Sequence, residues 1–281
     1  MSLVEVSELH RVFRMGRGAE DVTAVNRVSF AIEPGEALGL VGESGSGKST
    51  IARILVGLER ADDGSAVIDG VDRLRPARSR AERLARARAV QMVFQDPNGS
   101  LDRRLTVEET LRRAIHLHDR GADVSAGALA ALLDRVRLTE RHARAKPHEL
   151  SGGQRQRVAI ARALAVSPKL VVLDEAVSAL DVSVQAQVLE LLAEIQRESG
   201  VSYLFVSHDL AVIRELCSRV LVLFRGTVVE QGETARVLSA PEHPYSRLLI
   251  ASTPGPGWDP ERVVRERMTF TQRMEAVAEG G

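Results

Sequence analysis

The residues with the clearest chemical meaning form a glycine- and serine-rich loop around a lysine, Gly42-Glu43-Ser44-Gly45-Ser46-Gly47-Lys48-Ser49-Thr50. The apolar stretch before it, Ala37–Val41, predicts a strand, and Lys48–Leu58 predicts a helix with one apolar face. Glycines in such a loop free backbone N–H groups to surround a phosphate, Lys48 can reach the outer phosphates, and Ser49 offers a hydroxyl to Mg²⁺. In this context the pattern predicts a nucleoside-triphosphate site rather than an ordinary flexible turn.

A second turn suited to anions is Leu150-Ser151-Gly152-Gly153-Gln154, which precedes a helix predicted over Gln154–Val166. Its two glycines expose backbone N–H groups, its serine adds a hydroxyl donor, and the start of the helix carries partial positive charge. A second phosphate-facing surface on one chain cannot fold back onto the first site. We therefore expect it to complete the nucleotide site of another copy of a similar chain.

Two carboxylates end an apolar run, Leu170-Val171-Val172-Leu173-Asp174-Glu175. We expect a buried strand here, with Asp174 at its end holding Mg²⁺ directly or through water. Glu175 would project beyond the strand and polarise the water that attacks the γ-phosphate. An Asp-Glu pair after a strand is common by chance, but together with the phosphate loop it indicates hydrolysis.

Two further polar residues follow predicted strands. Gln95 comes after Val90–Phe94 and could reach both the metal ion and the attacking water, while His208 comes after Tyr203–Val206 and could contact the γ-phosphate. A lone histidine is more often structural, so His208 gains its meaning only beside the other motifs.

Strands and helices alternate along the chain, which predicts a mostly parallel sheet covered by helices. A helix is expected over Val182–Glu198, with Asp181 as its N-cap. The remaining expected strands are Leu3–Leu9, Val25–Ile32, Ser65–Ile68, Val220–Phe224 and Thr227–Glu230.

Three segments have a different character. Arg73–Arg88 is rich in arginine without aromatic residues and predicts a solvated helix rather than a nucleic-acid contact. Asp96–Glu149 predicts an inserted helical subdomain, with a loop bounded by Gly121 and Gly127. The tail after Pro241 contains further prolines and predicts an extended, peripheral segment; these prolines are Pro244, Pro254, Pro256 and Pro260.

Composition narrows the function classes. The 281 residues include 44% apolar ones, enough for a substantial core, and the formal net charge of zero gives no argument for binding nucleic acid or an anionic membrane. A single cysteine, Cys217, excludes an intrachain disulfide and four-cysteine metal sites. No apolar run approaches the roughly 18–20 residues that span a bilayer, and no signal-peptide core is present, so we expect a soluble, cytoplasmic chain.

Together these motifs resemble the nucleotide-binding subunit of an ABC transporter, over nearly the whole chain from Phe13 to about Leu249. The resemblance implies an α/β fold: a P-loop NTPase (RecA-like) core with an antiparallel β subdomain and an inserted helical subdomain. It divides the chain into a core of residues 1–95 and 155–235, a helical part of residues 96–154 and a C-terminal extension of residues 236–281.

The same resemblance implies ATP and Mg²⁺ as cofactors and a role for each matched residue. The expected catalytic residues are Glu175, His208 and Gln95, and the expected metal ligands are Ser49, Gln95 and Asp174. The expected ATP-binding residues fall into three groups. Phe13 would stack on adenine, and the phosphate loop would contribute Gly42, Ser44, Gly45, Gly47, Lys48, Ser49 and Thr50. The signature residues Ser151, Gly152, Gly153 and Gln154 would act from a second subunit, together with Asp181 of the D-loop. Ala176 departs from the family's usual proline after the Asp-Glu pair, and we expect activity with a less rigid turn.

Other segments look like the ATPases of bacterial peptide and nickel importers, among them Met92–Pro97, Pro147–Leu150, Asp181–Gln187 and His243-Pro244-Tyr245. The implied partners are a second ABC ATPase subunit, identical or a paralogue, integral-membrane permease subunits that would dock on Asp96–Thr110, and indirectly a solute-binding protein. The chain would work at the inner face of the cell membrane, with no nucleic acid as a partner. An oligopeptide or dipeptide is favoured as cargo over nickel or another small solute. A soluble ABC ATPase acting on nucleic acid or ribosomes, or a subunit that binds ATP without hydrolysing it, are the rival functions.

Overall fold

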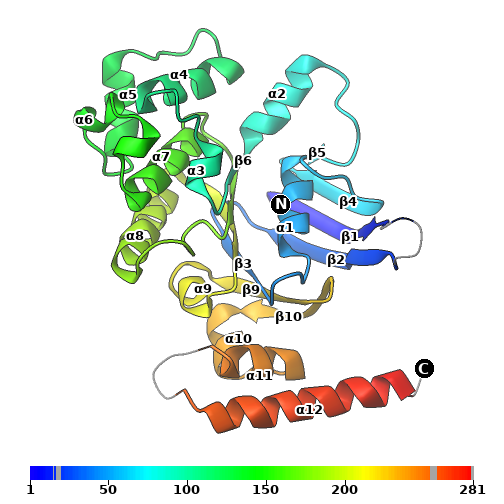
Figure 1. Cartoon of the computed structure of the whole chain (residues 1–281). Helices are drawn as coiled ribbons and strands as arrows, with labels where there is room; N and C mark the ends of the chain where they lie inside the picture. The colour runs from blue at the N-terminus through cyan, green and yellow to red at the C-terminus, as the bar shows by residue number, and fades with distance from the viewer. Residues whose placement is uncertain (15, 17–19, 254–257, 280–281) are drawn as a thin grey trace.

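Two β-sheets form over the described residues of this computed structural model, which are 1–14, 16, 20–253 and 258–279 (Figure 1). The larger sheet has the strand order β10-β9-β3-β8-β7-β6. In chain order its strands are β3 (Ala37–Val41), β6 (Val90–Val93), β7 (Leu170–Asp174), β8 (Ser202–Ser207), β9 (Arg219–Phe224) and β10 (Thr227–Glu233). All its neighbouring strands pair in parallel except β9 and β10, which form an antiparallel hairpin.

The smaller sheet is antiparallel, in the order β2-β1-β4-β5. Its strands are β1 (Val4–Phe13), β2 (Val22–Ile32), β4 (Asp63–Ile68) and β5 (Val71–Asp72). The mostly parallel sheet expected from the sequence is confirmed. The first strand extends beyond the expected Leu9, because its pairing with β2 continues to Phe13 and Val22.

Helices surround the larger sheet and form a group beside it (Figure 1). They are α1 (Lys48–Val56), α2 (Arg80–Ala89), α3 (Pro97–Ser100), α4 (Val107–His118), α5 (Ala126–Asp134), α6 (Glu140–Ala143), the 3-10 helix η1 (Pro147–Glu149), α7 (Gly152–Leu164), α8 (Val182–Ser199), α9 (Leu210–Leu216), α10 (Thr234–Ser239), α11 (Pro244–Ala251) and α12 (Pro260–Glu279). Within the part of the chain that the structure describes, no helix has both the length and the apolar character needed to cross a membrane.

The strands β3, β7, β8 and β9 of the larger sheet are buried on both faces, which explains why they are nearly continuous apolar runs. Leu170 and Val172 of β7 pack with α1 and the smaller sheet, whereas Val171 and Leu173 pack with α7, α8 and α9. Successive side chains of a strand point to opposite faces, so the same strand closes two cores. The single cysteine, Cys217, is buried in the second of these cores.

Several expected helix boundaries are wrong. The first helix ends at Val56 rather than Leu58, because Gly57 takes a left-handed conformation as its C-cap. Only the second half of Arg73–Arg88 is helical, since Ser79 caps α2 with its hydroxyl. The loop expected to end at Gly127 ends earlier, because Ser125 caps α5 and Gly127 lies inside that helix.

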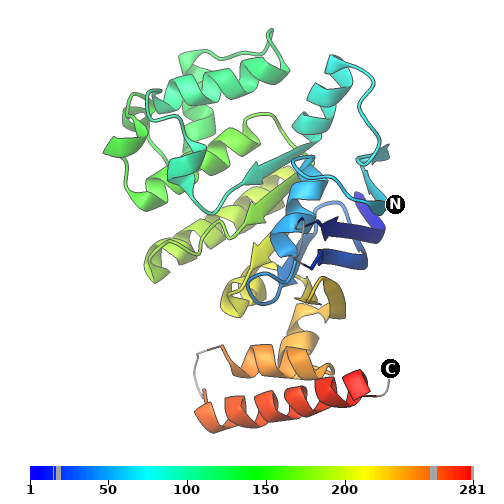
Figure 2. The same cartoon turned by 45° about the vertical axis from the view of Figure 1, so that its right-hand side comes forward.

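The C-terminal tail is also helical rather than extended, where it is described. Pro244 and Pro260 each stand at the first position of a helix, where proline is tolerated because its missing N–H would have no intrahelical acceptor. Pro254 and Pro256 lie outside the described residues. Figure 2 shows α11 and α12 side by side as a layer below the larger sheet.

Candidate nucleotide site

The sheet order gathers the polar motifs at one edge of the larger sheet. Parallel strands β3, β8, β7 and β6 are consecutive neighbours, and their carboxyl ends are level: Val41 pairs with Ser207, and Asp174 pairs with Val206. The phosphate loop follows β3, Glu175 follows β7 and His208 follows β8. Ligands of open α/β sheets bind at this edge.

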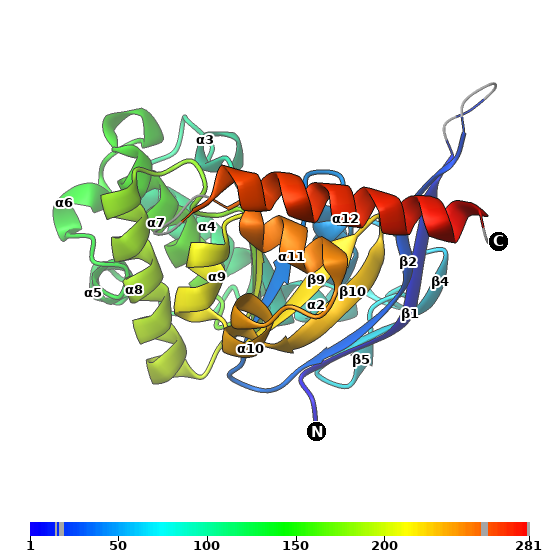
Figure 3. The ribbon, with the colours of Figure 1, turned by 90° about the horizontal axis from the view of Figure 1, so that it is seen from below.

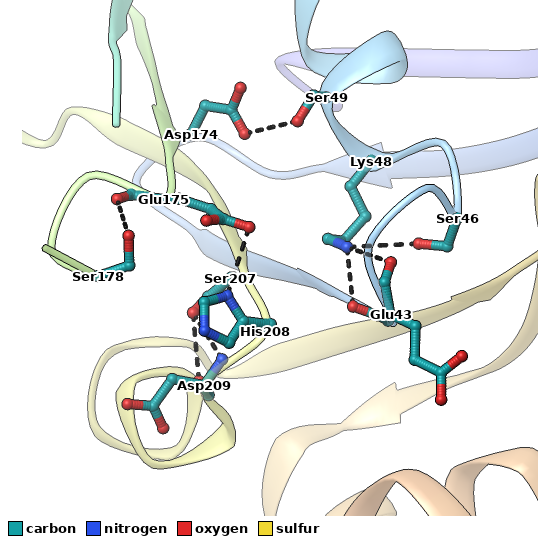
Figure 4. A network of polar contacts seen from close by, with 11 residues as sticks. Glu43, Ser46, Lys48, Ser49, Asp174, Glu175, Ser178, Ser207, His208 and Asp209 are labelled. Carbon is teal, nitrogen blue, oxygen red and sulfur yellow. Dashed lines mark hydrogen bonds and ion pairs between the residues drawn. The ribbon is translucent and has the colours of Figure 1, made fainter. Parts of the chain in front are cut away.

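The phosphate loop closes around its own lysine (Figure 4). The Lys48 ammonium donates to the carbonyl oxygens of Gly42 and Glu43, both at 2.7 Å, and to the Ser46 hydroxyl at 3.4 Å. Gly42 has φ +151°, and a Cβ there would lie 2.2 Å from the carbonyl oxygen of Leu223, so the close approach of β9 requires glycine. Gly42 is therefore packed directly against β9.

The remaining loop residues lie where the sequence suggested. Ser44 and Gly45 are exposed at the tip of the loop, Gly47 is the N-cap of α1, and Ser49 and Thr50 lie in the first turn of that helix. The start of α1 thus faces the loop with the partial positive charge and free N–H groups that suit a phosphate.

Ser49 and Asp174 form the part of the site suited to a divalent cation. The Ser49 hydroxyl donates to an Asp174 carboxylate oxygen at 3.0 Å, although 125 positions separate the two residues in the chain. Burial raises the pKa of Asp174 above its ordinary value and lowers the pKa of Lys48 below its own. Hydroxyl and carboxylate oxygens are the ligands that Mg²⁺ takes, so this pair fits the expected metal.

Glu175 and His208 meet across the ends of β7 and β8 (Figure 4). His208 Nδ1 lies 3.3 Å from a Glu175 carboxylate oxygen, and the histidine side chain is 58% exposed. Glu175 has a left-handed backbone, with φ 48°. Two hydrogen bonds hold this conformation: the Glu175 N–H donates to the Val206 carbonyl, and the Ser178 hydroxyl donates to the Glu175 carbonyl. The turn that starts at Ala176 is therefore hydrogen-bonded despite lacking the family's proline.

Gln95 and Phe13 lie at the margin of this constellation. Gln95 is exposed two residues past the end of β6, and no contact places it on Asp174 or Glu175 in the structure described. Phe13 ends β1, and the Arg11 guanidinium lies over its ring, 4.7 Å from the ring centroid. A cation already occupies one face of that ring, so the other face is the one that an adenine could use.

The signature turn begins α7, two residues earlier than the sequence suggested. Ser151 is the N-cap: its hydroxyl accepts from the Gln154 N–H, and the Gln154 side chain accepts from the Ser151 N–H. The serine hydroxyl proton stays available to donate outward, as a phosphate contact would need. The expected division of the chain between residues 154 and 155 falls inside this helix.

Gly153 and Asp181 connect the signature turn with α8. A Cβ on Gly153 would lie 2.4 Å from Cγ1 of Val184, so a larger residue there would force the valine to shift. The neighbouring Gly152 would meet only Leu180, at an ordinary 3.9 Å. Asp181 stands at the N-cap position of α8, as expected, but its side chain makes no capping hydrogen bond there.

Two contacts of the site were missed from the sequence. The Ser178 hydroxyl donates to the Glu175 carbonyl three residues earlier, and the Tyr245 hydroxyl accepts a hydrogen bond from the N–H of Glu43, 202 positions away in the chain. The His243-Pro244-Tyr245 motif was a signal for the second contact, but it pointed to a branch of a family rather than to the phosphate loop.

Comparison with known proteins shows which family this chain resembles. A family model described as ABC transporter matches residues 25–178. The glutathione import ATP-binding protein GsiA of Escherichia coli (strain K12) is 46% identical over 244 residues, which cover 85% of this chain and 38% of that protein. GsiA of Salmonella typhimurium is 47% identical over 241 residues, with the same coverage of 85% and 38%. The chain thus spans less than two fifths of the length of these curated relatives.

Solved structures match over most of their own length. The ATP-binding cassette MJ0796, in a dimeric post-hydrolysis state bound to ADP and Pi, has 31% identity and a TM-score of 0.72, covering 82% of this chain and 98% of that one. CbiO1 from Clostridium perfringens, part of the ABC transporter complex cbiONQ, has 26% identity and a TM-score of 0.73, covering 85% and 91%. The α/β P-loop fold expected from the sequence is therefore confirmed.

Proposed function

Because this chain belongs to the ABC transporter ATPase family, we propose that it binds and hydrolyses ATP to power an importer. The observation that carries the proposal is the single sheet edge on which Lys48, the Ser49–Asp174 pair and the Glu175–His208 pair meet. Bound MgATP supplies the phosphoanhydride bond that is cleaved and the cation that offsets its negative charge. The chain's own residues do the binding and the orienting.

Each of these residues has a distinct role in the proposal. The loop N–H groups and Lys48 hold the β- and γ-phosphates, and Ser49 and Asp174 hold Mg²⁺ with help from Gln95. Glu175 takes the proton of the attacking water, while His208 holds the Glu175 carboxylate in place and contacts the γ-phosphate. Phe13 offers its free ring face to adenine.

The signature turn acts on the nucleotide of a second cassette. In favour of this, Ser151–Gln154 and Asp181 stand exposed or half-buried at helix starts, and a similar cassette has been solved as a dimer bound to ADP and Pi. ATP would favour the closed pair and product release the open one, so that hydrolysis cycles the chain between two states.

The cargo is a small peptide in this proposal. The relatives are named for import of glutathione, which is a tripeptide, and this favours a peptide over nickel. The proposal also includes three expectations from the sequence. The chain divides at residues 96, 155 and 236, a permease docks on Asp96–Thr110, and the chain works at the inner face of the membrane. With a formal net charge of zero, the chain offers no general attraction to nucleic acid.

The test is ATP binding and phosphate release by the purified chain, with two matched lysine variants. Lys48→Ala should bind ATP at least about tenfold more weakly, since the loop loses its only cation. Lys169→Ala should match the unaltered chain, because that exposed lysine pairs with Asp69, away from the phosphate loop. If Lys48→Ala binds ATP as the unaltered chain does, the proposed site is wrong.

The transport step needs its own measurement. Purification of the chain with its membrane partner, followed by reconstitution into vesicles, should give ATP-dependent uptake of labelled glutathione or dipeptides and not of labelled nickel. Uptake of nickel alone would move the chain to the alternative cargo and leave the ATPase assignment intact.

A further inference from the structure

The C-terminal helices reach the phosphate loop through the side chain of Tyr245. Tyr245, the second residue of α11, is only 1% exposed, and its hydroxyl accepts a hydrogen bond of 2.9 Å from the Glu43 N–H. Figure 3 shows α11 lying between α12 and the β9–β10 hairpin, beside which the loop is built. The tail that the sequence suggested to be peripheral therefore reaches the proposed nucleotide site.

This hydrogen bond acts on the peptide unit that also holds the loop's lysine. The N–H of Glu43 and the carbonyl of Gly42 belong to one planar peptide group. Tyr245 binds the N–H end of that group, and the Lys48 ammonium binds the carbonyl end at 2.7 Å. The orientation of this peptide thus sets one of the three acceptors that hold the ammonium.

Glycine makes an external anchor necessary at this point. Gly42 precedes the peptide and has φ +151°, a region that glycine enters without a side chain to restrict rotation. With no Cβ at residue 42, the peptide that follows is held by its hydrogen-bond partners. Tyr245 is the partner from outside the loop.

The tyrosine ring is itself held firmly. Its centroid lies 4.4 Å from that of Phe224, at the end of β9, and 5.7 Å from that of Phe270 on α12. The Tyr245 N–H donates to His243 Nδ1, which caps α11, and the His243 N–H donates to the Glu230 carboxylate of β10. Sheet and C-terminal helices together set where the hydroxyl stands.

We propose that Tyr245 is a positioning residue of the nucleotide site: it fixes the Gly42–Glu43 peptide, and through it the Lys48 ammonium, for binding the outer phosphates of ATP. The proposal rests on the proposed function and assigns part of that function to the C-terminal extension. Without the hydroxyl, the Glu43 N–H loses its acceptor, and the peptide can turn its carbonyl away from Lys48.

The experiment compares the chain's two tyrosines, both of them buried. Tyr245→Phe removes the hydroxyl at the loop, and Tyr203→Phe removes a hydroxyl that donates to the Leu192 carbonyl within the core. Each variant loses one hydrogen bond of a tyrosine hydroxyl, the one at Tyr203 buried and the one at Tyr245 half-buried, so the fall in Tm should be small in both and no larger in Tyr245→Phe. Tyr245→Phe alone should raise the Kd and KM for ATP, by about five- to twentyfold, with kcat changed much less.

A second readout follows the loop directly. Hydrogen exchange at the Glu43 amide should be slow in the unaltered chain and in Tyr203→Phe, and at least about tenfold faster in Tyr245→Phe. Equal ATP affinity and equal Glu43 exchange in the two variants would overturn the positioning role while the ATPase assignment stands. If the unaltered chain itself binds no ATP, the proposed function fails as well.

Discussion

Glu175 stands in a conformation that its own side chain disfavours. A left-handed backbone costs a residue with a Cβ about 1–3 kcal/mol, and here two hydrogen bonds on the Glu175 backbone offset that cost. The strained turn directs the carboxylate back towards His208 instead of along the strand. Such strain at a reactive carboxylate is consistent with a catalytic role and with the proposed use of Glu175 as the base.

The role of Glu175 leads to a prediction at the residue scale. Glu175→Gln should lower kcat for ATP hydrolysis by about 10²–10⁴-fold, the usual contribution of a general base, because an amide cannot accept the water's proton. The Kd for ATP should stay within about threefold of its original value, since Lys48 and Ser49 are untouched. Phosphate release and nucleotide titration measure the two effects.

The matched control is Glu215→Gln, an exposed carboxylate on α9. It should leave both kcat and the Kd for ATP unchanged. Unaltered turnover in Glu175→Gln would remove the base from the proposed mechanism.

At the scale of elements, local signals set where several helices begin. Serine or threonine hydroxyls accept capping hydrogen bonds at Ser79, Thr106, Ser125 and Ser151. The error at α7 arose because its first residues are Gly152 and Gly153, which have low helix propensity. In the fold, Gly153 packs directly against Val184 of α8, where a Cβ would force that side chain to shift.

The close approach of α7 and α8 can be tested by changing the size of the side chains where they meet. Gly153→Ala should lower the stability by about 1–3 kcal/mol, because its Cβ would overlap Val184, and a second change, Val184→Ala, should restore most of the loss. Gly152→Ala is the control, because its Cβ meets an ordinary contact distance. Denaturant unfolding of these variants and the unaltered chain measures the effect; additive losses in the double variant would contradict it.

At the scale of the whole molecule, one edge of the larger sheet brings together parts of the chain that are distant in sequence. The loop after β3 is held from one side by the β9–β10 hairpin and Tyr245, while the strand ends on its other side carry the carboxylates and His208. The signature turn lies elsewhere, at the start of α7, and packs against α8. This separation is what makes a second chain necessary in the proposed mechanism.

The pairing of two chains gives a prediction at this scale. With MgATP, Glu175→Gln should double its molar mass in light scattering, because the nucleotide stays uncleaved between Lys48 of one chain and Ser151 of the other. Adding Ser151→Tyr should keep ATP binding and prevent the doubling, since a bulky side chain at this exposed N-cap blocks the partner's phosphate. Adding Lys48→Ala should abolish both. Pairing that persists after the Ser151→Tyr change would contradict a role for this turn in trans.

The sequence alone determined the features that depend on neighbouring residues. A strand, a glycine-rich loop and a helix start follow one another in Ala37–Thr50, and their local backbone preferences are enough to predict a phosphate site. The buried run before Asp174 and Glu175 was equally readable, because continuous apolar residues are what a strand covered on both faces requires.

Only the tertiary structure decided which distant residues meet. The order β3-β8-β7 brings Ser49 to Asp174 and Glu175 to His208, and no local pattern fixes strand order. The sequence also suggested a peripheral tail, because proline disrupts helices internally, whereas Pro244 and Pro260 begin them. Packing of α11 on the sheet then puts Tyr245 against the phosphate loop, a contact that depends on the shape of the whole fold.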